Sequence, residues 1–334
     1  KRCLMTRRAY EQASSEPCAE YKASQIQGES LLNLCGGLGV DDTAFATSFQ
    51  SIWSVELDAS LHEMAVENDQ RFHLETVHRI QGDSMEFLAN SERNYDWIYA
   101  DPDRREGQAR LVSLEDCQPS LLQNWERIQA CSTSQLIKLS PLYSLDKLEQ
   151  ELPGLYRIDV VAIKGEVKEV LAFCHSAGYP SSPERRAIEL EPYQHFAGIP
   201  EKLESTSLNS PYFYEAHASL AKTDLAGTYV REMGGQPLIP NALYIQSDQP
   251  LPSFFGRGFI IESEGPYNRK KFDAYLKEQG ITKANLSCRF FRLSPPELKK
   301  QHRLQDGGEH YFFFFENREK KPVFIHGKKL ADIG

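Results

Sequence analysis

The chain has 334 residues, 40% of them hydrophobic and 25% charged, with a formal net charge of −9 at pH 7. This length accommodates two or three domains. No apolar run reaches the roughly 18 residues of a membrane span, so we expect no membrane partner. The seven cysteines are scattered without Cys-x-x-Cys spacing, which predicts a cytoplasmic location and no metal site.

The first half of the chain alternates between strand-like and helix-like segments. Residues 6–26 are predicted to be helical, and the apolar run from Leu31 to Leu34 reads as a buried strand that breaks into a glycine turn. The elements expected after this turn are strands at 51–55, 77–80, 95–100 and 135–138 and helices at 41–48, 60–71, 83–89 and 119–131. Such alternation predicts crossover units and a mainly parallel, doubly wound α/β sheet.

The pattern changes in the second half. Residues 156–163 and 167–174 are predicted to form an antiparallel hairpin at the edge of the sheet. Beyond it we expect a charged, proline-containing loop at 179–186, a helical segment at 215–231, strands around Leu243 and Phe259, helices at 270–279 and 295–301, and a strand at 311–315. We therefore predict three domains: residues 1–192, a small α+β domain at 193–265 with a ferredoxin-like arrangement as one option, and residues 266–334.

Charge is unevenly placed along the chain. Residues 266–334 contain 15 Lys and Arg against 8 Asp and Glu, a local charge of +7, which leaves −16 for the remainder. An anionic partner would explain this asymmetry, and the solvated face of a small domain explains it equally well.

The glycine turn indicates a nucleotide-type cofactor. Its spacing is Gly36-Gly37-x-Gly39, with Asp42 where a dinucleotide-binding turn would carry its third glycine, and no Gly-Lys-Ser/Thr phosphate loop is present. S-adenosylmethionine is the remaining common cofactor. Glu56, at the end of the second strand, is placed to accept hydrogen bonds from the ribose hydroxyls, and Asp83 is placed for the adenine amine.

With these features together, residues 6–175 resemble the class I S-adenosylmethionine-dependent methyltransferases, and specifically the bacterial family whose catalytic domain precedes a THUMP-like domain. The resemblance rests on the segments Arg7–Glu16, Leu31–Asp41, Asp96–Arg105, Leu114–Cys117, Leu136–Pro141, Leu286–Pro295 and Leu304–Gly308. It implies a Rossmann-like domain followed by smaller α+β domains, the last of them THUMP-like. One departure is Asn33, where many members carry Asp. The amide of Asn33 offers no negative charge to the methionine ammonium group. The predicted cofactor-binding residues are Asn33, Cys35, Gly36, Gly37, Gly39, Glu56, Leu57, Asp83, Ser84 and Asp101.

The loop Asp101-Pro102-Asp103-Arg104 limits the choice of methyl acceptor. It lacks the aromatic residue that stacks on a flipped base in exocyclic-amine methylation. Uracil C5 chemistry would require a cysteine nucleophile just after the strand that ends at Lys138, and the residues there are Leu139, Ser140 and Pro141. Direct transfer to nitrogen or oxygen is therefore predicted, with Asp101 and Asp103 as catalytic residues.

Arg104, Arg105 and Lys138 are predicted to bind the substrate, the two arginines by gripping a phosphate. An alternative with equal weight is that the two arginines pair with Glu115 and Asp116 and only shape the loop. A lysine such as Lys138 commonly pairs with an acidic side chain.

RNA, either tRNA or rRNA, is the leading acceptor, because THUMP domains are associated with RNA. The run Phe312–Phe315 is interpreted as a buried strand rather than a platform for stacking bases. The open alternatives are a methyltransferase of a small molecule or protein, and a non-catalytic module that keeps the cofactor fold. The sequence gives no basis for an oligomeric state.

Overall fold

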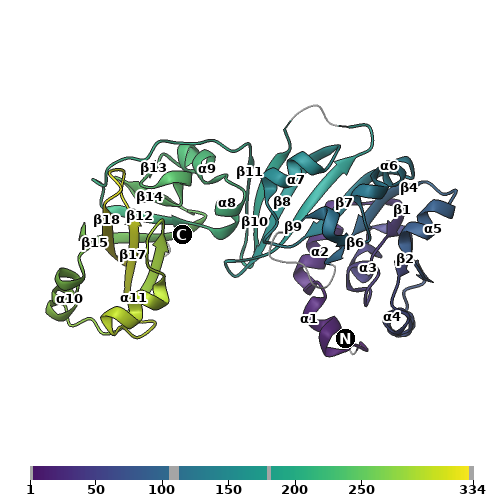
Figure 1. The fold of residues 1–334 in the computed structure, drawn as a ribbon, viewed down its shortest axis with the longest axis horizontal. Coiled ribbons are helices and arrows are strands. Elements are labelled where there is room, and N and C mark those ends of the chain that lie inside the picture. Colours follow the sequence, from purple (N-terminus) through teal and green to yellow (C-terminus); the bar gives the residue numbers. More distant parts are fainter. Residues whose placement is uncertain (1–2, 105–112, 179–181, 331–334) are drawn as a thin grey trace. The chain divides into compact units, whose positions relative to one another are not determined.

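The computed structural model describes residues 3–104, 113–178 and 182–330. The chain divides into two compact units, Lys1–Tyr193 and Gln194–Gly334 (Figure 1). The first boundary lies next to the predicted one, but the second predicted boundary, between 265 and 266, falls inside the strand β15 (Gly256–Pro266). In the structure, residues 194–334 form one compact unit, and one sheet runs through both of the predicted C-terminal segments. The division of this part into two domains stays a prediction.

The first unit supplies eight strands of a nine-stranded sheet with the order β11-β10-β8-β9-β7-β4-β1-β2-β3, whose edge strand β11 begins at Tyr193, the last residue of that unit. The strands of this sheet are β1 (Gly28–Asn33), β2 (Phe49–Glu56), β3 (Val77–Gln81), β4 (Tyr95–Ala100), β7 (Ser132–Leu139), β8 (Leu155–Ile163), β9 (Glu166–His175), β10 (Glu184–Leu190) and β11 (Tyr193–Gly198). The helices of the first unit are α1 (Arg7–Gln12), α2 (Glu16–Gln25), α3 (Val40–Phe45), α4 (Ala59–Phe72), α5 (Ser84–Asn90), α6 (Trp125–Ala130) and α7 (Leu145–Glu151).

The centre of this sheet is parallel, as predicted. β1 pairs with β2 and β4, β2 with β3, and β4 with β7, all in parallel. The antiparallel hairpin of β8 and β9 is present, but it lies inside the sheet and not at its edge. Residues 184–186, predicted to end a loop, begin β10, which runs parallel to β8, so the sheet continues beyond the hairpin.

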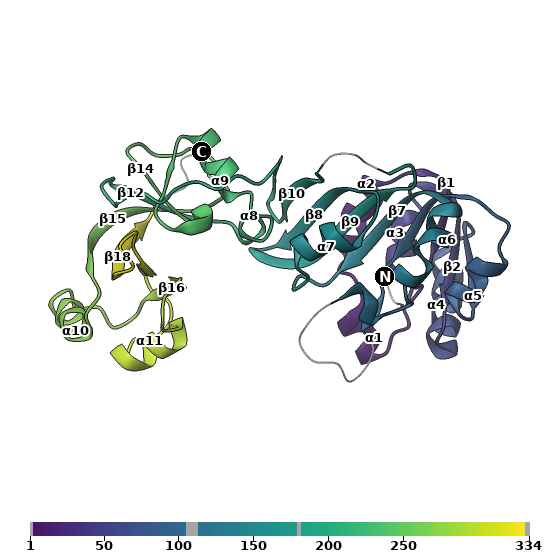
Figure 2. The same cartoon turned by 45° about the horizontal axis from the view of Figure 1, so that its top comes forward.

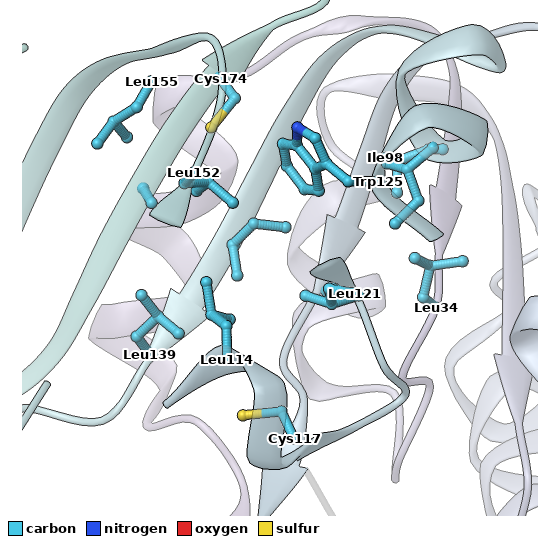
Figure 3. Packing of buried hydrophobic residues seen from close by; sticks show 14 of the residues in the cluster. Leu34, Ile98, Leu114, Cys117, Leu121, Trp125, Leu139, Leu152, Leu155 and Cys174 are labelled. Carbon is cyan, nitrogen blue, oxygen red and sulfur yellow. The ribbon is translucent and has the colours of Figure 1, made fainter. Parts of the chain in front are cut away.

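Hydrophobic side chains cover both faces of the sheet. One face packs against α5, α6 and α7 through residues such as Leu88, Trp125 and Leu148, and Figure 3 shows part of this cluster around Trp125. The other face packs against α2 and α3 through Tyr21 and Phe45. The sheet is therefore buried on both sides, as expected for parallel strands joined by helical crossovers.

The N-terminal helix predicted at 6–26 is interrupted. α1 ends at Gln12 and α2 begins at Glu16, with Ser15 at the N-cap position and a proline in the first turn of α2. Proline is favoured at the start of a helix because its missing N–H would lack an intrahelical partner there. The break matters for the site because it brings Ser14 to the glycine turn.

The second unit contains a seven-stranded sheet with the order β13-β14-β12-β15-β18-β17-β16 (Figure 2). Its remaining elements are β12 (Tyr212–Ala216), α8 (Ala218–Lys222), α9 (Ala226–Met233), β13 (Gln236–Pro237), β14 (Tyr244–Ser247), α10 (Arg269–Glu278), β16 (Asn285–Arg289), α11 (Pro295–His302), β17 (His310–Glu316) and β18 (Pro322–Lys329). Two short helices replace the single one predicted at 215–231.

The phenylalanine run forms the middle of β17. Phe312 and Phe314 pack with α10 and α11, while Phe313 and Phe315 pack on the opposite face of the sheet. All four are buried, with exposed fractions of 0 to 2%. The prediction of a buried strand is confirmed, and neither set of rings can stack on a base.

None of the helices in the described ranges is long and apolar enough to cross a membrane.

Candidate cofactor and acceptor site

A cavity opens at the carboxyl ends of β1 to β4, where ligands of parallel sheets usually bind. All ten predicted cofactor-binding residues line its wall, together with Asp103. Short two-residue strands, β5 (Asp103–Arg104) and β6 (Cys117–Gln118), pair beside it, and Gln118 and Pro119 join the wall. The structure thus gathers into one place residues that are spread over about seventy positions of sequence. Their roles toward a cofactor remain predictions.

The glycine turn is shaped by its packing against the neighbouring strands. The Gly36 N–H donates to the Val55 carbonyl at 2.8 Å, and a Cβ on Gly36 would lie 2.7 Å from the Ser54 hydroxyl. Gly39 has a φ of +79°, and a Cβ there would collide with the Arg79 guanidinium. These two glycines are therefore required by contacts within the protein. A Cβ on Gly37 would meet open space, but the φ of +52° at this residue favours glycine there as well.

Glu56 is fixed at the wall by backbone donors. Its Oε2 accepts from the Gly37 N–H at 2.7 Å and its Oε1 from the Asp58 N–H at 2.8 Å. Each carboxylate oxygen can accept a second hydrogen bond. The side chain is thus oriented, with capacity left for two hydroxyl donors, while the half-exposed Leu57 offers an apolar surface beside it.

Asp83 has a structural role of its own. As the N-cap of α5, its Oδ1 accepts from the N–H groups of Met85 at 2.7 Å and Glu86 at 3.0 Å. Ser84, the first helical residue, is buried. Capping uses one carboxylate oxygen, which leaves Oδ2 for a donor such as an adenine amine.

Asn33 is tied into the protein by both of its polar side-chain atoms. Its Nδ2 donates to Asp42 Oδ1 at 2.7 Å, and its Oδ1 accepts from the Cys35 N–H at 2.9 Å. The side chain is 1% exposed. Asn33 therefore holds the start of the turn, and the amide suits this place because a carboxylate there would face the buried carboxylate of Asp42.

Lys138 pairs with Asp101 at the end of β4. Burial raises the pKa of Asp101, and Lys138 opposes that effect. Burial acts to lower the pKa of Lys138, but Asp101 and Asp41 outweigh it and the pKa is raised. Lys138 is thus a cation at neutral pH, and Asp101 is a stronger base than an ordinary aspartate. Burial also raises the pKa of the Cys35 thiol well above its usual value, which keeps it protonated.

Sequence reasoning missed a buried charge network beneath the cavity. Lys22, with no exposed surface, contacts Asp41 Oδ1 and Glu169 Oε2, each at 3.1 Å. Tyr99 and Ser14 donate to Asp41 Oδ2 at 2.6 and 3.0 Å. Asp41 looked like an ordinary residue in the first turn of a helix, and nothing in the polar sequence of α2 marks Lys22 as buried.

Arg105 lies outside the described residues. Arg104 belongs to β5, opposite Cys117. Substrate binding by these two arginines therefore stays a prediction, as does their pairing with Glu115 and Asp116.

The cavity wall is strongly acidic. Five carboxylates line it, and none of its described residues is a lysine, arginine or histidine. The five are Asp41, Glu56, Asp83, Asp101 and Asp103. Such a wall repels the phosphates of a dinucleotide and attracts a cationic ligand.

Comparisons with known proteins agree with this architecture. The chain is similar over 98% of its length to a proposed methyltransferase from Porphyromonas gingivalis W83, of which it covers 83%, at 29% identity with a TM-score of 0.86. Residues 256–329 match the family model described as THUMP domain-like. The chain is a methyltransferase-fold protein with a THUMP-like domain. This domain begins at β15, ten residues before the start predicted from the sequence.

Other similarities are weaker. A proposed methyltransferase from Escherichia coli is 14% identical, with a TM-score of 0.34 over 52% of this chain and 89% of its own. An S-adenosylmethionine-dependent methyltransferase from Agrobacterium tumefaciens is 16% identical, with a TM-score of 0.35 over 48% of this chain and 60% of its own. A comparison of the sequence with curated proteins finds no match.

Proposed function

We propose that the protein transfers a methyl group from S-adenosylmethionine directly to a nitrogen or oxygen of RNA, most simply tRNA or rRNA. The observation that carries the choice of donor is the acidic cavity wall, which contains five carboxylates and no described basic residue. S-adenosylmethionine supplies a sulfonium-activated methyl group and is cationic at both its sulfur and its amine. A wall of this charge favours it over a cofactor that carries phosphates.

The residues present fit this donor. Glu56 would accept from the ribose hydroxyls with the oxygen capacity that Gly37 and Asp58 leave open. Asp83 and Ser84 would hold the adenine, and the turn from Asn33 to Gly39 would hold the methionine part. Asp41, at the junction of the wall and the Lys22 network, adds a carboxylate near the turn.

Asp101 and Asp103 would orient the acceptor and take up its proton. Asp101 suits the role of base because burial raises its pKa, and Lys138 holds the carboxylate in place. Asp103 is exposed, where an incoming acceptor can reach it. Arg104 and Arg105 follow directly and would grip a phosphate of the substrate.

RNA as the acceptor is supported by the THUMP-like match and by the charge of the same region. Residues 266–334 carry 15 basic against 8 acidic side chains. A net positive charge in a region that overlaps a THUMP-like domain is expected of a protein that binds a phosphate backbone.

The test is methyl transfer to RNA. Purified protein is incubated with S-adenosylmethionine labelled in the methyl group and total RNA from cells lacking the gene, and the RNA is digested to nucleosides for mass analysis. We expect one labelled nucleoside. Asp101→Asn should slow its formation by roughly 100-fold, because a carboxylate general base is removed, while Asp146→Asn on the exposed surface of α7 should not.

Label that enters only a protein or small-molecule fraction would contradict the RNA acceptor and leave the donor standing. The absence of both transfer and donor binding would favour the non-catalytic alternative.

A further inference from the structure

Three side chains from three adjacent strands of the second unit meet on one face of the sheet. They are Glu262 of β15, His310 of β17 and His326 of β18, and one ligand-type atom of each lies within 4.8 Å of the other two. The His310 Nδ1 lies 3.0 Å from the His326 Nε2, which lies 3.3 Å from the Glu262 Oε2. These residues take no part in the proposed methyl transfer.

Strand register explains the meeting. β17 and β18 are antiparallel with Phe312 opposite His326, so His310, two residues from Phe312, projects from the same face. On the other side of β18, the pairing with β15 shifts between Ile261 and Ser263. Glu262 is the extra residue of this bulge, a feature that re-aims side chains. Figure 1 shows the three strands side by side.

The spacing suits a tetrahedral metal ion. Zinc binds histidine nitrogen at about 2.0–2.1 Å and carboxylate oxygen at about 2.0–2.2 Å, so two ligands of a tetrahedron lie roughly 3.3 Å apart. Both measured separations around His326 are close to this value. Two histidines and one glutamate form a familiar zinc donor set that leaves a fourth position for water.

The surroundings of His326 resemble those of a metal ligand. Its Nδ1 lies 2.7 Å from the Tyr275 hydroxyl of α10, and a metal-bound histidine commonly uses its second nitrogen in this way. Its ring stacks on Phe312 at 4.5 Å and 20°, which fixes the ring plane. His326 is 3% exposed, whereas Glu262 is exposed, so an ion could enter from the glutamate side.

We propose that Glu262, His310 and His326 bind one divalent transition-metal ion, with Zn²⁺ preferred, and that Tyr275 orients His326. Sequence reasoning had no signal for this site because the ligands come from three separate strands and none is a cysteine. The ion would tie β15, β17 and β18 together within the THUMP-like domain.

The test is zinc binding by the full-length protein. After treatment with a chelator and its removal, the protein is titrated with Zn²⁺ alone in competition with a chromogenic chelator. We expect one bound ion per chain, lost in Glu262→Gln and in His310→Ala. Tyr275→Phe should weaken binding by roughly 10-fold, as for other residues that orient a ligand. Glu264→Gln on the same strand and His73→Asn in the first unit are the matched controls and should bind as the unaltered protein does.

Cobalt in place of zinc provides a second readout. Co²⁺ bound to the unaltered protein should give the intense visible absorption of a tetrahedral site, and the spectrum should disappear in Glu262→Gln, a surface change that leaves the core intact. No stoichiometric binding, or equal binding by Glu262→Gln, His310→Ala and the controls, would overturn the proposal and identify the cluster as a hydrogen-bonded histidine pair.

Discussion

At the scale of single residues, Asn33 and Asp42 show how the glycine turn is held. Asp42 has no exposed surface and accepts from Asn33 Nδ2, the Ser54 hydroxyl and Arg79 Nη1. Burial raises the pKa of Asp42, and Arg79 opposes that effect. One buried carboxylate is thus satisfied by three donors. A carboxylate in place of Asn33 would keep the Cys35 N–H as a donor but could not donate to Asp42.

Asn33→Asp should therefore destabilise the first unit. We expect the free energy of unfolding to fall by about 1–3 kcal/mol at pH 7, because a donor to a buried carboxylate is replaced by a like charge. The two neighbouring carboxylates, at positions 33 and 42, would repel each other. This repulsion raises their pKa in the folded state above the value in the unfolded state, so the pair tends to bind a proton. The folded variant then holds more protons than the unfolded one, so the loss should shrink as the pH falls toward 5.

Urea unfolding followed by tryptophan fluorescence would measure this change, because all three tryptophans, Trp53, Trp97 and Trp125, lie in the first unit. Asn90→Asp, at an exposed position, should change stability by at most about 0.5 kcal/mol. A loss in Asn33→Asp that is independent of pH would contradict this explanation.

At the scale of elements, the Lys22 network joins α2, α3 and β9. Burial acts to lower the pKa of Lys22, but Asp41 and Glu169 outweigh it and the lysine stays charged. The same two carboxylates raise the pKa of Lys138, so the network also stabilises the charged form of the lysine that pairs with Asp101. Ser14, in the break before α2, and Asp41, in the first turn of α3, thus contact each other and both line the cavity.

Lys22→Met should cost about 3–5 kcal/mol of stability, because it leaves Asp41 and Glu169 buried without their shared cation. Lys168→Met, which breaks an exposed pair with Glu166 on β9, should cost at most about 0.5 kcal/mol. Thermal unfolding of both variants, followed by tryptophan fluorescence, would compare them. Equal stability of the two would show that the network contributes little.

The elements also show what a sequence can predict. Alternating apolar segments located β1 to β4 and the glycine turn, because local periodicity and turn residues depend only on neighbours in sequence. The position of the β8–β9 hairpin inside the sheet depends on β10, whose charged residues Glu184 to Arg186 suggested a loop. Lys22 and Glu169 are 147 positions apart, so only the fold reveals their contact.

At the scale of the whole molecule, the two units carry different surfaces. The cavity of the first unit is acidic, whereas the THUMP-like domain contains exposed basic residues on α10 and near α11. The exposed residues of this kind include Arg269, Lys270, Lys271, Lys277, Lys300 and Arg303. If RNA is the acceptor, these side chains would bind its backbone, while the first unit would carry out the transfer.

Lys270→Glu combined with Lys271→Glu should weaken RNA binding and lower its dependence on salt. Each lost phosphate contact reduces the slope of log K against log salt by roughly 0.7–0.9. Fluorescence anisotropy with a labelled tRNA at several salt concentrations would measure that slope. Lys168→Glu, an exposed site in the first unit, is the control. Weak, salt-independent binding by the unaltered protein would contradict an RNA partner and favour a small-molecule or protein acceptor.

The most direct test of the whole account is calorimetric titration of the full-length protein with S-adenosylmethionine. We predict binding at a single site and, in Glu56→Ala, a roughly 100-fold loss of affinity, because two hydrogen bonds to a charged acceptor are removed. Glu63→Ala, an exposed residue of α4, should bind as the unaltered protein does, and tryptophan fluorescence would show that both variants fold. No binding by the unaltered protein, or equal affinity in Glu56→Ala, would contradict the assignment of the glycine-turn cavity as the methyl-donor site.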